Sequence, residues 1–351
     1  MTAAKKKNSR RKQARFRSSR RKRIRNTVLL LFLLVVLGGT GIGAIYVLRN
    51  GTVFDKLEEA YVASREFSGG ITDLDSLRTD GFAKNLCVVV SDVPMDGVSL
   101  GENQKGLLLD LDDRKVLYSK QALQKVYPAS ITKIMTAMLA LKYGNMDDVV
   151  TITQENLNLE EGSQVCGFWA GDQVTLDQLL HCLLVYSGND AAAAIAEHVG
   201  GSTEGFVEMM NSYARELGCT GTHFTNPHGL QDENHYTTPY DIYLMLKEAL
   251  NYPEFTQITQ SGSYTVEYTH ADGSSASTTL LATDHYLTGE ATPPKNVTIL
   301  GGKTGTTDNA GNCLALLSQN AYGNPYISIV MGASTKDELY EQMSSLLQNI
   351  N

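Results

Sequence analysis

Three short motifs in this sequence carry residue types that could perform acyl-transfer chemistry. In the first, a serine stands three residues before a lysine, at Ser130 and Lys133. Residues three apart on a helix share one face, so the two side chains would meet. The apolar run 134–141 predicts that this helix is buried, and burial favours the neutral lysine amine, which is a usable base. The start of the helix would also offer backbone N–H groups to a developing oxyanion.

This first motif is weak when taken alone. Pro128 disfavours a helical conformation in the residue before it, so we expect the helix to begin at about Ser130. A serine three residues before a lysine arises by chance about once in a chain of this size. The pair also fits an N-cap serine followed by a lysine whose charged end reaches water.

The other two motifs supply further polar groups. Ser187-Gly188-Asn189 lies between an apolar helix, 176–185, and an alanine-rich one, 191–199, and a plain helix–helix turn is the alternative. Lys303-Thr304-Gly305-Thr306 follows an apolar strand and offers a positive charge, hydroxyl groups and a glycine that permits close approach of a ligand. A glycine-rich turn is the alternative for this segment. In this order the three motifs match the set of class A β-lactamases and penicillin-binding proteins, which is far more specific than any one of them.

The elements that must position these motifs are strands at both ends of the sequence and helices between them. A short strand at 86–90 and a hairpin of 106–111 with 115–118 are expected first. A helical stretch covers about 130–250, and 334–350 is typical of a terminal helix with Ser334 and Asp337 as its capping pair. Further strands are expected at 263–269, 277–281, 297–300, 313–317 and 326–331. This order predicts an α+β fold in which one sheet is built from both ends of the sequence.

Charge is divided sharply along the chain. Thirteen of its 30 lysines and arginines lie in 1–26, where there is no acidic residue, and all 38 acidic residues follow. An acidic body argues against nucleic acid as a partner, because phosphate binding needs clustered lysine and arginine. Residues 27–48 carry no charge. A helix of that length spans about 33 Å, which is enough to cross a hydrocarbon core of about 30 Å.

These features predict the domain organisation. We expect a basic cytoplasmic tail at 1–26, one transmembrane anchor at 27–48, a stalk at 49–83 and a globular domain at 84–351. Within that domain a helical subdomain is expected at about 142–250. The positive-inside rule places the N-terminus in the cytoplasm and the globular domain outside the cell membrane. A cleaved signal peptide is the alternative, since 38–41 is rich in small residues.

The metal-ligating residue types show no metal-binding pattern. The five cysteines have no metal spacing, and their odd number leaves at least one thiol free, so we expect mostly buried structural thiols and at most one disulfide. His223, His228 and His235 are close in sequence, but no acidic motif such as HExxH accompanies them. The sequence therefore predicts neither a metal site nor a cofactor.

Around these motifs the sequence resembles the serine D-Ala-D-Ala carboxypeptidases, the low-molecular-weight penicillin-binding proteins, from about residue 84 to 334. The residues that flank the three motifs fit as well as the motifs themselves, as does the segment Ala310-Gly311-Asn312-Cys313-Leu314. The most discriminating segment is Phe224-Thr225-Asn226-Pro227-His228-Gly229-Leu230. It occupies the interval in which class A β-lactamases carry a Glu-x-x-Leu-Asn loop, and its presence argues against that class.

The resemblance implies a fold and a set of roles. The fold would be of the β-lactamase/DD-peptidase type, an antiparallel sheet flanked by helices with an inserted all-helical subdomain. Ser130 would attack the penultimate D-Ala, Lys133 would accept its proton, Ser187 would relay a proton to the leaving D-Ala, and Asn189 would hold the peptide amide. The backbone N–H groups of Ser130 and Thr306 would form the oxyanion hole. Lys303 and Thr304, beside Gly305, would bind the terminal carboxylate.

The resemblance also implies partners. The substrate would be the peptidoglycan stem peptide, β-lactams would acylate Ser130, and no cofactor would be needed. Two other activities remain open, an endopeptidase or transpeptidase of the same fold and a wall or β-lactam sensor without turnover. Many family members carry a β-rich second domain and a C-terminal amphipathic helix. Because about forty residues follow the third motif, we expect neither here.

Overall fold

The computed structural model describes residues 85–350. The expected basic tail at 1–26, anchor at 27–48 and stalk at 49–83 lie outside the described residues. Between 85 and 350, no helix combines the length and the apolar character needed to cross a membrane.

A five-stranded antiparallel sheet joins the two ends of the described domain, in the order β2-β1-β9-β8-β7. Its strands are β1 (Lys105–Asp110), β2 (Lys115–Lys120), β7 (Thr298–Thr307), β8 (Gly311–Gln319) and β9 (Pro325–Ala333). The pairing of β1 with β9 brings the first and last strands together, as strands at both ends of the sequence predict. The expected hairpin and three C-terminal strands are thereby confirmed.

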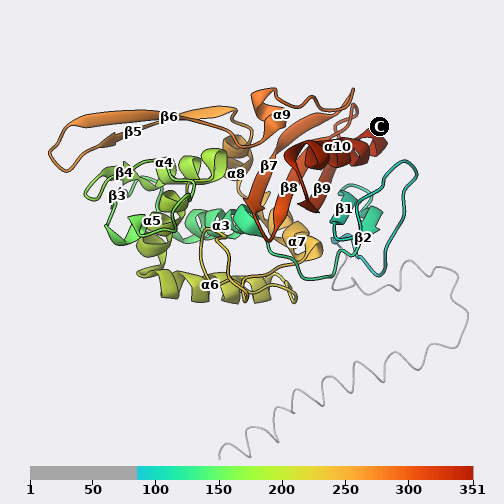
Figure 1. Cartoon of the computed structure of the whole chain (residues 1–351), viewed down its shortest axis with the longest axis horizontal. Helices are drawn as coiled ribbons and strands as arrows, with labels where there is room; N and C mark the ends of the chain where they lie inside the picture. Colours follow the sequence, from blue (N-terminus) through green and yellow to red (C-terminus); the bar gives the residue numbers. More distant parts are fainter. Residues whose placement is uncertain (1–84, 351) are drawn as a thin grey trace, which may run out of the picture. The chain divides into compact units, whose positions relative to one another are not determined.

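This sheet is buried on both faces, which explains its continuous apolar runs. Along β8, Leu314 and Leu316 pack with α10 (Lys336–Leu347), while Ala315 and Leu317 face the helical layer. Figure 1 shows α10 lying across the sheet. Because side chains alternate along a strand, two cores form, one on each side of the sheet.

The helical layer follows from long apolar segments between the strands. Its longer helices are α3 (Lys133–Tyr143), α5 (Asn189–Gly200), α6 (Thr203–Glu216) and α7 (Pro239–Ala249). Shorter ones are α4 (Leu176–His181), α8 (Pro253–Thr259) and α9 (His285–Thr288), with a 3-10 turn η1 (Ala129–Thr132) and a π-helical turn η3 (Cys182–Tyr186). Helix α3 is fully buried along most of its length, as its apolar composition predicts.

The expectation of one sheet and an all-helical subdomain is wrong. A second antiparallel sheet, β3-β4-β5-β6, lies beside the helices (Figure 1). Its strands are β3 (Val149–Thr151), β4 (Gln173–Thr175), β5 (Ser263–Thr269) and β6 (Ser275–Leu281). The first two fall inside the expected helical stretch, and three residues are too few to show the alternation by which a strand is recognised.

Two smaller predictions are also wrong. Residues 86–90 form no strand, because the backbone of Cys87 pairs with the hydroxyl groups of Tyr240 and Tyr243 instead of a neighbouring strand. The terminal helix is capped by Thr335, whose side chain accepts from the backbone N–H of Glu338 at 3.1 Å. The capping pair therefore lies one residue later than expected.

The prediction for the cysteines is confirmed. All five are buried and none forms a disulfide.

Candidate active site

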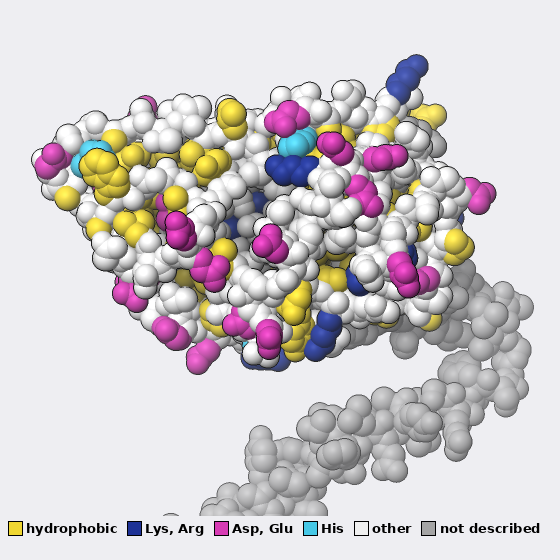
Figure 2. All heavy atoms as spheres, viewed as in Figure 1, with side chains coloured by type: hydrophobic (Ala, Val, Ile, Leu, Met, Phe, Trp, Pro, Cys, Tyr) yellow, Lys and Arg dark blue, Asp and Glu magenta, His cyan; other side chains and the backbone are white. Residues whose placement is uncertain are grey.

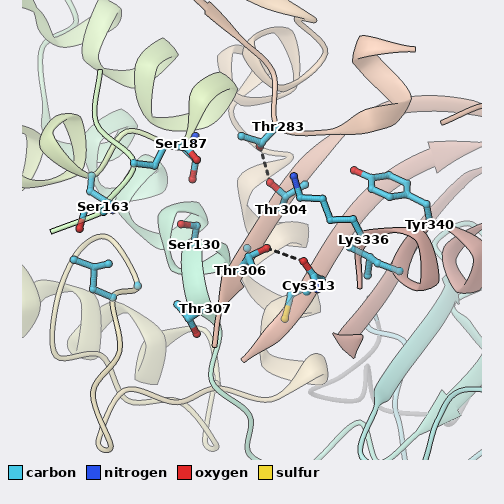
Figure 3. Close-up of a pocket in the computed structure, with 18 residues that line it drawn as sticks. Ser130, Ser163, Ser187, Thr283, Thr304, Thr306, Thr307, Cys313, Lys336 and Tyr340 are labelled. Carbon is cyan, nitrogen blue, oxygen red and sulfur yellow. Dashed lines mark hydrogen bonds between the residues drawn. The ribbon is translucent and has the colours of Figure 1, made fainter. Parts of the chain in front are cut away.

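Residues from all three motifs line one cavity of about 370 Å³. Ser130 comes from η1, Ser187 from the turn after η3, and Asn189 from the first position of α5. Thr304, Gly305 and Thr306 come from β7. Figure 3 shows Ser130 between Ser187 on one side and the threonines of β7 on the other. The fold therefore brings together segments separated by more than a hundred residues.

Ser130 and Lys133 meet as their spacing predicts. The α-helix begins at Lys133, and Ser130 lies in the preceding 3-10 turn, so the helical run starts where expected but with tighter geometry. Lys133 Nζ lies 2.9 Å from Ser130 Oγ, and it also donates to Asn189 Oδ1 at 2.7 Å and to the carbonyl of His228 at 2.8 Å. Three segments thus converge on one amine.

Lys133 is fully buried, and no carboxylate between residues 85 and 350 contacts its amine. Desolvation by burial, reinforced by the charge of Lys303, holds the pKa of the Lys133 amine well below its ordinary value of 10.5. Asp190 opposes this shift. The carboxylate of Asp190 is instead occupied by the backbone N–H groups of Cys166 and Gly167. A neutral amine at this place can accept the proton of the Ser130 hydroxyl.

A second buried lysine, Lys303, contacts the second motif. Lys303 Nζ donates to Ser187 Oγ at 2.9 Å and to the carbonyl of Thr304 at 3.0 Å. Burial lowers the pKa of Lys303 to about 7, although Asp284 favours the charged form. Ser187 has a left-handed backbone, φ 70°, which turns its hydroxyl out of η3 toward the lysine. Lys303 of the third motif therefore contacts Ser187 of the second motif directly.

Close packing of β7 against η1 explains the glycine of the third motif. A Cβ on Gly305 would stand 2.9 Å from the backbone nitrogen of Ser130 and 3.0 Å from that of Ile131. Only glycine allows the strand to approach the start of the serine helix so closely. Thr304 Oγ1 lies 2.6 Å from Thr283 Oγ1, and Thr306 donates to Asn312 at 3.2 Å.

The segment Phe224–Leu230 closes the site behind Lys133. Gly229 has φ 90°, and a Cβ there would stand 1.9 Å from the carbonyl oxygen of Ala129. Thr136 donates to the carbonyl of Pro227, which fixes the segment to α3. The segment therefore supplies the His228 carbonyl as an acceptor.

The neighbouring histidines are structural. His235 Nε2 lies 2.8 Å from Thr132 Oγ1. Burial lowers the pKa of His235 to about 4 and that of His228 to about 3, so both rings are neutral near pH 7. Within residues 85–350 no group of three or more histidine, cysteine, aspartate or glutamate side chains is arranged to hold a metal ion.

The cavity also contains residues that the sequence motifs do not indicate. Thr283, Lys336 and Tyr340 line it beside Thr304. Among the described residues that line the cavity, Lys336 is the only charged one, and Figure 3 shows its side chain reaching from α10 toward Thr304. No local pattern marks these residues, because they enter the site only when α10 and the segment before α9 pack beside β7.

The close approach at Gly229 yields a stability prediction. Gly229→Ala combines a strained backbone with a backbone clash, whereas Gly273→Ala, at φ 85° with nothing within 4 Å, is strained alone. A left-handed alanine costs about 1–2 kcal/mol, and a forced overlap adds about 1–3 kcal/mol. We expect Gly229→Ala to lower the free energy of unfolding more than Gly273→Ala, as measured by urea denaturation. Equal losses would contradict the close contact between Gly229 and Ala129.

Both the sequence and the fold of this chain are similar to those of known proteins. The model of the family described as D-alanyl-D-alanine carboxypeptidase (peptidase S11) matches residues 101–335. The chain is 37% identical over 252 residues to D-alanyl-D-alanine carboxypeptidase DacF of Bacillus subtilis, covering 70% of this chain and 61% of that protein. It is 34% identical over 253 residues to DacC of Escherichia coli, covering 69% of this chain and 59% of that protein. The chain thus spans about three fifths of the length of these curated relatives.

Solved structures show the same fold. The Streptomyces K15 DD-transpeptidase aligns with a TM-score of 0.65 at 27% identity, covering 74% of this chain and 98% of that one. A D-alanyl-D-alanine carboxypeptidase from Mycobacterium tuberculosis aligns with a TM-score of 0.63 at 28% identity, covering 73% of this chain and 92% of that one. Family model, relatives and fold agree with the geometry of the site, and the chain belongs to the D-alanyl-D-alanine carboxypeptidase family, peptidase S11.

Proposed function

We propose that this protein is a serine D,D-carboxypeptidase that removes the terminal D-Ala from peptidoglycan stem pentapeptides. The observation that carries the proposal is the contact between Ser130, which lines the cavity with Ser187, and the buried Lys133, whose pKa is held well below 10.5. Family membership supplies the substrate class.

Acylation would begin at Ser130. The neutral Lys133 amine accepts the hydroxyl proton while Ser130 Oγ attacks the carbonyl carbon of the penultimate D-Ala. The backbone N–H groups of Ser130 and Thr306 would stabilise the oxyanion. Asn189 Oδ1 is held by Lys133, which leaves the Asn189 amide N–H₂ free to donate to a substrate peptide carbonyl.

Ser187 and Lys303 would complete the step. Ser187 passes a proton to the nitrogen of the leaving D-Ala and recovers one from Lys303, which donates to it. The C–N bond then breaks and an ester to Ser130 remains. Lys133 then gives up the proton it took from Ser130, and Lys303 regains the one it lost. Water attacks the ester while the neutral Lys133 amine accepts a proton from it, and that proton returns to Ser130 Oγ as the shortened peptide leaves. A β-lactam carbonyl would acylate Ser130 in the same way.

The terminal carboxylate would bind beside Thr304. Lys303 alone supplies limited charge there, because its pKa is about 7 and its protons are committed to Ser187 and Thr304. Lys336 is exposed on the cavity wall and would pair with the carboxylate. This pairing extends the expected carboxylate site by one residue.

We also propose that the catalytic domain works outside the cell, anchored by residues 27–48. The basic block 1–26 directly before an uncharged segment supports this orientation. The peptidoglycan stem peptide also lies outside the membrane, which agrees with an external catalytic domain.

Transpeptidation is the second candidate. The Streptomyces K15 DD-transpeptidase shares the fold, so the same acyl-enzyme could pass to an amine instead of water. Product analysis on a stem pentapeptide separates the two. Cross-linked dimer without free tetrapeptide would contradict the hydrolase.

The nucleophile can be tested by labelling with a fluorescent penicillin. Ser130→Ala should abolish covalent labelling, because among the described residues the hydroxyl group that contacts Lys133 is that of Ser130, and the other two contacting oxygens are carbonyl oxygens. Ser163→Ala is the matched control, since Ser163 lines the same cavity without contacting either lysine. Persistent labelling of the Ser130→Ala protein, or equal loss in both variants, would contradict the assignment.

The base can be tested through the pH dependence of acylation. Because the folded pKa of Lys133 lies below 10.5, the neutral base becomes populated as pH rises through that lowered pKa. The rate constant for acylation by penicillin should therefore rise with pH well below pH 10.5. It should fall again as Lys303, the proton donor to Ser187 with a pKa of about 7, loses its proton. Lys133→Arg, which stays charged, should label at least about a hundredfold more slowly, in line with loss of a general base. A rise that continues to pH 10.5 would exclude this lysine as the base.

The carboxylate partner can be tested with matched substrates. Lys336→Gln should raise KM about tenfold for a pentapeptide with a free C-terminus, the size of one charge-assisted contact. It should leave acylation by the C-terminal amide analogue unchanged. Lys115→Gln, an exposed lysine on β2, is the control. Equal effects on acid and amide would remove Lys336 from the carboxylate site.

A further inference from the structure

The one tryptophan of the chain is displayed at the surface yet held rigidly. Trp169 is 67% exposed. Its ring stacks on His270, with centroids 4.8 Å apart and planes inclined by 19°. Asp172 fixes both residues, accepting from His270 Nδ1 at 2.7 Å and from the backbone N–H of Trp169 at 2.8 Å. Because the Asp172 carboxylate is 1% exposed, this Trp169 platform (Trp169, His270 and Asp172) is anchored to the core.

Such an arrangement is pre-organised for contact. Exposing a large apolar ring to water is unfavourable, so covering the ring with a ligand would be favourable. Because the buried carboxylate of Asp172 already fixes Trp169 and His270, binding would cost little additional conformational freedom. The preceding residue, Phe168, is buried and packs edge-on against Tyr268 with centroids 5.2 Å apart. The backbone that carries the tryptophan is therefore clamped on both sides.

The platform is connected to the catalytic cavity by a short, fixed segment. Gly162, Ser163 and Gln164 line that cavity, and Trp169 follows five residues after Gln164. The carbonyl of Gln164 accepts from the backbone N–H of Asn189 at 2.8 Å, so the segment is tied to the site at one end and to Asp172 at the other. In Figure 2, hydrophobic side chains gather over the turn of β5 and β6, on the face that is hollowed at its centre.

The size and charge of the exposed surface around Trp169 limit the kind of ligand that could bind there. The large hydrophobic side chains exposed along this described segment are Trp169 and, at 40%, Val165. That area is far below the roughly 800 Å² per partner of a stable protein interface. Glu160 and Glu161, also exposed, disfavour anionic lipid and nucleic acid. A neutral ligand with one flat apolar face fits better.

We propose that the Trp169 platform binds the N-acetylated amino-sugar backbone to which the stem peptide is attached. One face of a pyranose ring presents C–H groups, which a flat indole can cover, while the hydroxyl and amide groups at the rim stay in water. With the stem peptide in the cavity, the sugar chain would run along the segment 162–169 to the platform. This inference rests on the proposed function for the identity of the ligand.

Binding can be measured directly on the full-length protein, because Trp169 is the only source of tryptophan fluorescence. Titration with a tetramer of N-acetylglucosamine should give a saturable change in intensity and emission maximum. Cellotetraose, which lacks the N-acetyl groups, should bind more weakly, and His270→Ala should raise the apparent Kd at least about fivefold through loss of the stacked support. An emission spectrum that stays unchanged at millimolar tetramer would overturn the proposal.

A second measurement separates the platform from the catalytic site. Trp169→Ala should lower kcat/KM for pentapeptide stems attached to glycan strands about tenfold, the worth of one aromatic contact, and leave the free pentapeptide unchanged. Tyr322→Ala, an 87% exposed aromatic residue at the turn between β8 and β9, should change neither rate. Equal rates for Trp169→Ala and wild type on both substrates would contradict sugar binding by the Trp169 platform and would leave the proposed function intact. If no pentapeptide is hydrolysed at all, the proposed function fails, and the fluorescence titration still decides whether the platform binds sugar.

Discussion

The site depends on one buried amine, Lys133, which contacts no carboxylate of residues 85–350. Lys133 contacts Ser130, Asn189 and the His228 carbonyl, and these three groups belong to different segments of the chain. Burying an ammonium group without a counter-ion is costly, and a lysine in this position relieves the cost by losing its proton. The same desolvation that makes Lys133 a base thus determines which segments must meet around it.

Lys303 modifies this arrangement in two ways. Its charge disfavours protonation of Lys133, and its own burial lowers its pKa to about 7. The two lysines therefore have separate roles, one as proton acceptor for Ser130 and one as donor to Ser187. Gly305 makes the arrangement possible, because any side chain there would push β7 away from the nitrogen of Ser130.

Much of this site could be predicted from the sequence, because the chemistry lies in short local motifs. Ser130 and Lys133 meet at a fixed spacing across η1 and the start of α3, and the apolar run after them predicts the burial of Lys133. The strands β8 and β9 contain apolar runs and are equally predictable. For β7 only the apolar start, 297–300, was predicted, and the third motif lies within this strand and not after it. The strands β3 and β4 were not predictable, since their three residues each are stabilised by pairing with distant partners, as Gln173 pairs with Thr269.

Residues that enter the site through packing alone were missed for the same reason. Lys336 belongs to a helix that folds back over the sheet, and Thr283 meets Thr304 only across two segments. Trp169 has no helical or strand periodicity around it, and its support from His270 spans a hundred residues. Long-range pairs of this kind leave no pattern in a single sequence.

The central claim is that Lys133 is neutral in the resting protein, and its protonation can be observed directly. The ε-carbon of lysine shifts in ¹³C NMR when the amine loses its proton, and comparison with Lys133→Met assigns the resonance. We predict that this resonance titrates well below pH 10.5, because burial and the charge of Lys303 lower the pKa of Lys133. A Lys133 resonance that stays in the charged position up to pH 10.5 would contradict this prediction.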